Sequence, residues 1–190
     1  MAVLSFVLGA LTSYAQGFLP DAVASLANSA SGWTLLTVLL LFWSRLPAPP
    51  AAALGAVSFV LLVLGYTAAT ELRGYTYDPL LFSVVGVAAG PFVGVATAWL
   101  RATAVRASLG TALLAGIGLG EAVYGLTIVG ETTDPTYWVV IGLVGIALLL
   151  GMLARSICGA IPIAVAGGGS AVVATAFVLS YRALGTVGLG

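Results

Sequence analysis

Residues 51–72 read AAALGAVSFVLLVLGYTAATEL, and Glu71 is the one charged residue among them. A helix gains 1.5 Å per residue, so this stretch would be about 33 Å long, enough to cross a hydrocarbon core of ~30 Å. The stretch therefore predicts a transmembrane helix, and apolar stretches of similar character recur along the rest of the chain.

The composition agrees with a lipid environment. Of 190 residues, 61% are hydrophobic and only 6% are charged, whereas a soluble domain is roughly 25% charged. So few charges cannot cover a surface that faces water, which leaves the bilayer as the solvent. No segment is long and polar enough for a separate soluble domain, so we expect one transmembrane domain over residues 1–190.

Breaks that contain Gly, Pro or Arg divide the chain into helices. We expect an all-α, polytopic membrane helix bundle of about seven transmembrane helices. The first has no basic residue before it, so we interpret it as part of the mature protein and not as a signal peptide. The predicted segments are residues 2–17, 21–45, 51–72, 79–101, 105–129, 136–154 and 157–182.

The second segment allows two interpretations. Its strongly apolar part, WTLLTVLLLFW, is too short to span the membrane alone. Started at Asp21, the helix is long enough, but Asn28 and several serines then lie at membrane depth, where they must face protein or water. We expect the full span; the alternative is a re-entrant or interfacial half-helix.

The arginines indicate the orientation. With seven spans, four arginines and no acid fall in the loops on one side, while five acids fall toward the other. Under the positive-inside rule the N-terminus is then cytoplasmic. The four arginines are Arg45, Arg101, Arg106 and Arg155, and the five acids are Asp21, Glu71, Asp78, Glu131 and Asp134.

Glu121 is the one acid that no loop explains, because it lies well inside the fifth segment. An intramembrane carboxyl group is costly, which makes Glu121 the first candidate catalytic residue; the alternative is a structural hydrogen bond to a neighbouring helix. Asp21 and Glu71 are further candidate acids, although each can equally serve its own helix end. We interpret Asp78, Glu131 and Asp134 as helix caps or solvated loop residues.

Many of the aromatic side chains fall in the half of the predicted bundle that lies toward the five acids, on the side away from the cytoplasm. Aromatic faces attract cationic species, so a pocket of aromatic residues and acids suits chemistry through carbocations. We expect such a cavity among the second to fifth helices. The candidate substrate-binding residues are Asn28, Trp33, Tyr66, Tyr77, Trp99 and Tyr124.

Small residues predict how the helices pack. Gly86, Gly90 and Gly94 repeat every fourth residue, as do Gly116 and Gly120. Stripes of this kind allow two helix backbones to approach closely.

Missing residues exclude several functions. The chain has no His, no Lys and one cysteine, Cys158, so we expect no metal site, no cofactor and no Ser/His or Cys/His nucleophile pair. An aspartate-rich motif that would hold a metal diphosphate is also absent. The net charge is zero, which makes nucleic acid an implausible partner.

Three stretches, TSYAQGFLPDAVASLANSASGW (12–33), AAGPFVGVATAWLR (88–101) and GLGEAVYG (118–125), together resemble a family of small actinobacterial membrane proteins that are mostly uncharacterised. In size, helix number, embedded acid and lack of a metal motif, the chain also resembles the small seven-helix membrane terpene cyclases of meroterpenoid and diketopiperazine pathways. That resemblance implies metal-independent, proton-initiated cyclisation of a prenyl chain. It supplies no matching catalytic motif, so the candidate residues rest on the reasoning above.

We therefore expect a multi-pass protein of the cell membrane that cyclises a farnesyl-type chain on a lipophilic, prenylated small molecule reached from the lipid bilayer. The alternative is a small-molecule transporter or the substrate-binding subunit of an energy-coupled importer. A third possibility is an accessory membrane protein without a small-molecule site.

Overall fold

The structure is a computed structural model that describes the backbone of residues 1–187 and the side chains of residues 1–184. Within this range the chain is all-helical and contains no strand. The elements are α1 (Ala2–Ala15), α2 (Asp21–Ala24), the 3-10 helix η1 (Ser25–Asn28), α3 (Ala30–Ser44), α4 (Ala48–Leu72), α5 (Leu80–Trp99), α6 (Ala104–Thr127), α7 (Pro135–Arg155) and α8 (Ala160–Val187).

The helices form two compact units. The first, Met1–Ala98, contains α1 to α5, and the second begins at Trp99 and contains α6 to α8. The single domain expected over residues 1–190 stays a prediction.

In the described part of the chain, five helices, α4 to α8, are long and apolar enough to cross a membrane. They coincide with the last five of the seven predicted segments and make a multi-pass membrane protein the natural interpretation. By contrast, α1 has 14 residues and would span about 21 Å. The number seven and the cytoplasmic N-terminus therefore stay predictions.

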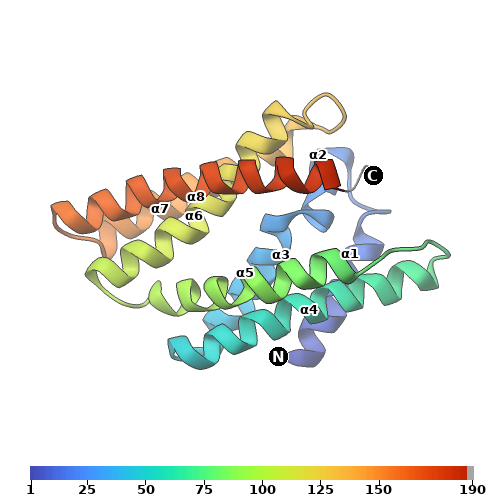
Figure 1. Ribbon diagram of the computed structural model, residues 1–190, viewed down its shortest axis with the longest axis horizontal. Helices are drawn as coiled ribbons and strands as arrows, with labels where there is room; N and C mark the ends of the chain where they lie inside the picture. Colours follow the sequence, from blue (N-terminus) through green and yellow to red (C-terminus); the bar gives the residue numbers. More distant parts are fainter. Residues whose placement is uncertain (188–190) are drawn as a thin grey trace. The chain divides into compact units, whose positions relative to one another are not determined.

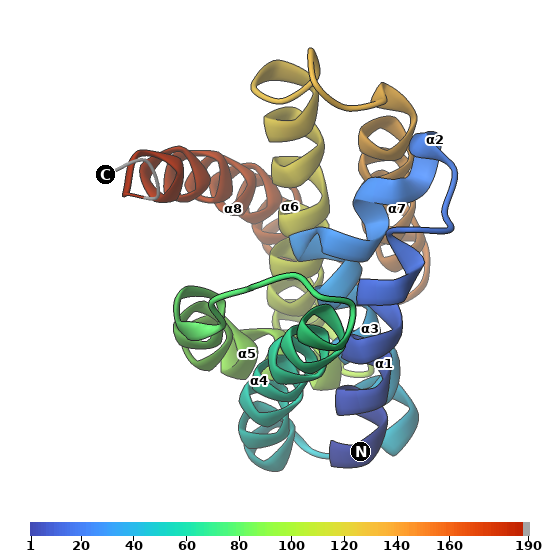
Figure 2. The ribbon, with the colours of Figure 1, turned by 90° about the vertical axis from the view of Figure 1, so that its right-hand side faces the viewer.

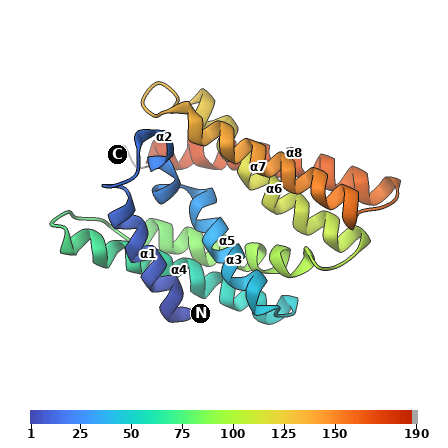
Figure 3. The ribbon, with the colours of Figure 1, turned by 180° about the vertical axis from the view of Figure 1, so that it is seen from behind.

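The second segment is not one helix, so the single helix expected over residues 21–45 is wrong, while the full membrane span expected there stays a prediction. The pair α2–η1 and the helix α3 meet at Ser29 with a bend of 64°, as a broken span or a re-entrant loop would (Figure 3). Ser29 has extended backbone angles and caps α3, because its hydroxyl accepts a hydrogen bond from the Gly32 N–H at 2.9 Å. Gly32 also allows the Leu26 carbonyl to lie where a side-chain methyl group would stand.

In the first unit, both α1 and α5 pack against α4. Figure 1 shows α4 and α5 side by side. A methyl group at Gly55 of α4 would overlap the carbonyl oxygen of Gly90 on α5, and one at Gly94 would overlap that of Ala51. The close approach predicted from the glycine stripe is thereby confirmed. On α1, Gly9 comes equally close to the carbonyl of Leu62.

In the second unit, α6 packs against both α7 and α8. Figure 2 shows α6 and α7 side by side, joined by the loop that follows α6. A methyl group at Gly116 would lie 2.6 Å from Cβ of Val173, and one at Gly120 would lie 2.8 Å from the Ala174 carbonyl oxygen. The second glycine stripe is therefore also a packing surface, directed at α8.

Candidate functional site

Four aromatic side chains of the first unit form a closed ring of contacts, which we call the aromatic cluster. It consists of Trp33 on α3, Tyr66 on α4, Tyr77 in the loop before α5 and Phe82 on α5. Trp33 lies 5.7 Å from Tyr66 and 6.1 Å from Phe82, measured between ring centroids. Tyr77 lies 4.9 Å from Tyr66 and 6.4 Å from Phe82. The cluster joins three predicted binding residues that are distant in the sequence.

The polar atoms of the aromatic cluster differ in their partners. The Tyr66 hydroxyl donates a hydrogen bond to Oε1 of Gln16 at 3.0 Å, and the Trp33 indole N–H reaches the Ala27 carbonyl at 3.4 Å. The Tyr77 hydroxyl is buried and has no hydrogen-bond partner among the residues that the structure describes. Burial, with smaller contributions from Tyr66 and Asp78, raises the pKa of Tyr77 to about 12. The Tyr77 phenol therefore keeps its proton, and no group in the described part of the chain accepts a hydrogen bond from it.

Local structure explains why these rings meet. The bend at Ser29 starts a new helix four residues before Trp33, which places the indole in the first turns of α3. At the other side, the Asp78 carboxylate accepts a hydrogen bond from the Leu80 N–H at 2.8 Å and so fixes the start of α5 between Tyr77 and Phe82.

A row of buried hydrogen bonds fastens α1 and α3 to α4. Ser58 bonds to Ser5 at 2.9 Å and to Thr37 at 3.4 Å, and Ser13 bonds to Thr70 at 2.8 Å. Hydroxyl pairs of this kind stabilise contacts between helices that water does not reach.

Arg73 closes the end of this row. It donates hydrogen bonds to the carbonyl and to the hydroxyl of Ser13, and its guanidinium lies 5.7 Å from the ring centre of Tyr14 and 5.5 Å from that of Tyr75. These contacts hold the C-terminal end of α1, and with it Gln16, beside α4.

The remaining site candidates of the first unit are less enclosed. Asp21 at the start of α2, Asn28 at the end of η1 and Glu71 in the last turn of α4 are all exposed. Trp99, which ends α5 and is the first residue of the second unit, is half-buried. The roles assigned to these four residues stay predictions.

Glu121 lies on α6, in the second unit, and is only 3% exposed. Tyr124, one turn further on, meets Tyr181 of α8 with 5.5 Å between ring centroids, and Tyr181 stacks on Phe177 at 4.3 Å. The second unit thus has its own buried acid and its own group of three aromatic rings. The catalytic role of Glu121 and the binding role of Tyr124 stay predictions.

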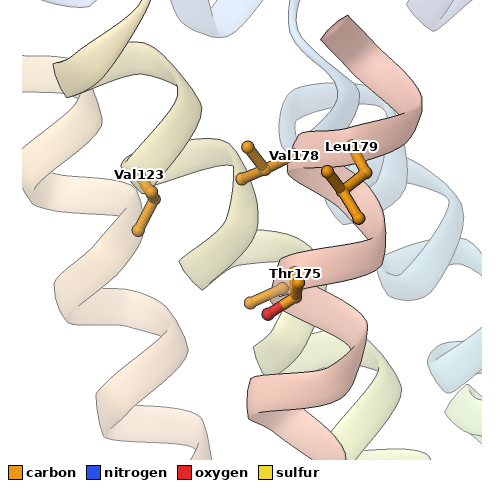
Figure 4. Close-up of a pocket in the computed structure, with 5 residues that line it drawn as sticks. Val123, Thr175, Val178 and Leu179 are labelled. Carbon is orange, nitrogen blue, oxygen red and sulfur yellow. The ribbon is translucent and has the colours of Figure 1, made fainter. Parts of the chain in front are cut away.

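A cavity of about 220 Å³ also lies in the second unit (Figure 4). Its one polar lining side chain, Thr175, already donates its hydroxyl to the Ala171 carbonyl at 2.9 Å. The cavity therefore offers an apolar surface without a polar anchor. It is lined by Val123, Ala174, Thr175, Val178 and Leu179.

Sequence reasoning missed two members of the site, Gln16 and Phe82. Gln16 carried a usable signal, because an amide just after an apolar helix needs a partner. Phe82 carried none, because an apolar residue in an apolar helix is unremarkable until the fold shows which ring it contacts.

The aromatic cluster can do two things chemically. Its π faces attract positive charge, and its one unsatisfied hydroxyl can donate a hydrogen bond. Within residues 1–187, no three His, Cys, Asp or Glu side chains stand together in a way that could hold a metal ion.

Comparison with known proteins places the chain in a family. No curated protein and no solved structure shows significant similarity to it. The sequence pattern of one family, described as a family of unknown function (DUF6518), matches residues 1–186. Because this match covers almost the whole chain, the protein belongs to the DUF6518 family of unknown function.

Proposed function

We propose that this protein is an integral terpene cyclase of the cell membrane, which closes rings in a farnesyl-type chain carried by a lipophilic small molecule. The aromatic cluster is the observation that carries the proposal. A prenyl chain folds against apolar faces, and each cation formed during ring closure is stabilised by the negative face of an aromatic ring. Trp33 and Tyr66 are 6% and 5% exposed, so their faces are shielded from water that would quench a cation.

The reaction needs no co-reactant. A carboxylic acid protonates the terminal alkene, forming a C–H bond and leaving a tertiary carbocation. The π electrons of the next alkene then form a C–C bond and move the cation along the chain. Loss of a proton to a weak base restores an alkene, so the product is an isomer of the substrate.

Glu121 is the acid best suited to the first step. Protonating an alkene requires an acid shielded from water, because water competes for the proton. Glu121 is buried, whereas Asp21 and Glu71 are exposed. Glu121 is therefore the first candidate for proton donation, and Asp21 and Glu71, the exposed acids of the unit that contains the aromatic cluster, are the alternatives.

The direct test is to incubate the purified protein, in nanodiscs, with a farnesylated indole and to search for a product of unchanged mass and altered retention by liquid chromatography and mass spectrometry. We expect such an isomer with the wild type and none with Glu121→Gln. Glu131→Gln, which changes an exposed loop acid, serves as the matched control and should retain activity. Absence of any isomer from folded wild-type protein with a series of linear prenyl substrates would overturn the proposal.

One observation favours a second function, the transport or capture of a small molecule. Transporter binding sites are often built at broken helices, whose free backbone groups contact the substrate, and α3 begins at such a break. Uptake of a solute into proteoliposomes, together with the absence of isomerised products, would favour this function over the cyclase.

A further inference from the structure

We infer that the Tyr77 hydroxyl donates a hydrogen bond to a neutral oxygen acceptor, that is a carbonyl, ether or epoxide oxygen, of the molecule bound at the aromatic cluster. The inference rests on the binding role proposed above for this cluster. It adds which chemical group the ligand presents and which residue recognises it.

The buried Tyr77 hydroxyl is the polar group of the cluster without a hydrogen-bond partner among the described residues. Buried hydroxyl groups almost always have a partner, and one that has none points to a missing water or ligand. The other two polar groups of the cluster are satisfied inside the protein, since Tyr66 bonds to Gln16 and the Trp33 indole to Ala27. Tyr77 is therefore the group of the aromatic cluster left to receive a ligand.

The Tyr77 hydroxyl would act as the donor of a hydrogen bond to the ligand. A raised pKa keeps the Tyr77 phenol protonated throughout the physiological range, so the group is available as a donor. The partner on the ligand must then be an acceptor. An aliphatic amine would be protonated near neutral pH and could not accept, so the acceptor is assigned to a neutral oxygen, as a prenylated carbonyl or epoxide compound would carry.

The charged side chains near Tyr77 disfavour an anionic ligand group. The carboxylate of Asp78 is adjacent in sequence and contributes to the raised pKa of Tyr77, so it would also repel an anionic ligand group. The nearest arginine along the chain, Arg73, is already engaged by Ser13 and by two tyrosine rings. A phosphate or carboxylate would thus meet repulsion without a free cation in this loop, whereas a neutral oxygen would not.

The aromatic rings around the Tyr77 hydroxyl favour a largely apolar ligand. A single polar donor among aromatic faces suits a mostly hydrocarbon molecule with one polar end. A prenyl chain attached to a carbonyl-bearing head, or a prenyl chain that carries an epoxide, has this character.

The experiment compares two probes of equal length, farnesylacetone and the hydrocarbon in which its carbonyl is replaced by a methylene group. Binding to the purified protein in detergent is followed by quenching of tryptophan fluorescence, and Trp33→Phe identifies the part of the signal that comes from the cluster. Both probes partition into micelles, so each variant is compared with the wild type in identical micelles. Farnesyl phosphate serves as the anionic probe.

We expect the wild type to bind the ketone about five- to tenfold more tightly than the hydrocarbon, as one added hydrogen bond allows. Tyr77→Phe keeps the ring and should bind the two probes equally. Tyr75→Phe, a change to an exposed tyrosine of the same loop, should keep the preference.

Three results would overturn the inference: equal binding of ketone and hydrocarbon by the wild type, binding of neither, or a ketone preference that survives in Tyr77→Phe. Tighter binding of farnesyl phosphate than of farnesylacetone would overturn the inference that the ligand group at Tyr77 is neutral. A Tyr77-dependent preference for the ketone without any cyclised product would overturn the proposed cyclase activity and leave this inference standing. A cyclised product together with a ketone preference that does not depend on Tyr77 would support the cyclase and overturn this inference.

Discussion

Replacing Gly90 with alanine inserts a methyl group where α5 touches the backbone of α4. The new Cβ would lie 2.6 Å from Cα and 2.7 Å from the amide nitrogen of Ala56, and 2.8 Å from the carbonyl carbon of Gly55. All three atoms are backbone atoms, so no side chain can rotate away. Ordinary contact begins at 3.4 Å, and the two helices must therefore separate by about 0.8 Å.

This separation has a cost that can be bounded. Inserting a carbon into a close-packed contact destabilises proteins by about 1–3 kcal/mol. Helix propensity works in the opposite direction, because alanine is favoured over glycine by roughly 1 kcal/mol in a helix interior. We expect a net loss of up to about 2 kcal/mol of unfolding free energy for Gly90→Ala, the difference between these two effects.

The matched control is Gly151→Ala on α7, where an added Cβ would meet nothing within 4 Å. The same chemical change there should be neutral or stabilising by up to about 1 kcal/mol. Both variants can be unfolded by sodium dodecyl sulfate in mixed micelles and followed by circular dichroism. An equal change of unfolding free energy in Gly90→Ala and Gly151→Ala, whether a gain or a loss, would refute the close-packing argument.

Three further outcomes follow from the site. Tyr66→Phe should lose about 1 kcal/mol of unfolding free energy, because the half-buried Gln16 keeps its acceptor without a donor, and a double-mutant cycle with Gln16→Leu should recover a coupling of similar size. Ser29→Ala should lose about 1 kcal/mol by removing the α3 cap that Gly32 uses, and Ser29→Asp, which restores an N-cap acceptor, should recover most of it in the same unfolding assay. Tyr77 ionises with a pKa of about 12 when folded and near 10 when unfolded, so its contribution to stability is complete below pH 10 and is lost as the pH rises toward 12. A wild type whose stability falls no more steeply than that of Tyr77→Phe between pH 10 and 12 would contradict this assignment.

The long apolar helices were predictable because their evidence is local. An apolar stretch such as residues 51–72 has few ways to satisfy its backbone groups in lipid other than a helix, and α4 occupies nearly those bounds. The glycine stripe through Gly86, Gly90 and Gly94 was predictable for a similar reason, because close packing is what a row of small residues on one helix face favours. Which helix each stripe would meet was not in the sequence.

The second segment shows where local evidence fails. Ser29 and Gly32 are common residues in membrane helices, and nothing in their spacing separates a polar stripe from a cap. The break forms because the Leu26 carbonyl packs against Gly32 and the Trp33 indole bonds back to Ala27. Those contacts depend on three-dimensional positions that the hydrophobic pattern does not encode.

The sequence by itself determined that the chain is helical, lipid-embedded and poor in chemistry-bearing groups, because composition and segment length fix how backbone polar groups are satisfied. It also pointed to Trp33, Tyr66 and Tyr77 as residues of interest. Only the tertiary structure decided that these three rings meet and that Phe82 completes the ring of contacts. It also decided that Gln16 accepts the hydrogen bond of Tyr66, whereas the Tyr77 hydroxyl finds no acceptor among the described residues. The physical reason is that hydrogen-bond satisfaction is a property of pairs, and the partners lie on helices that only folding brings together.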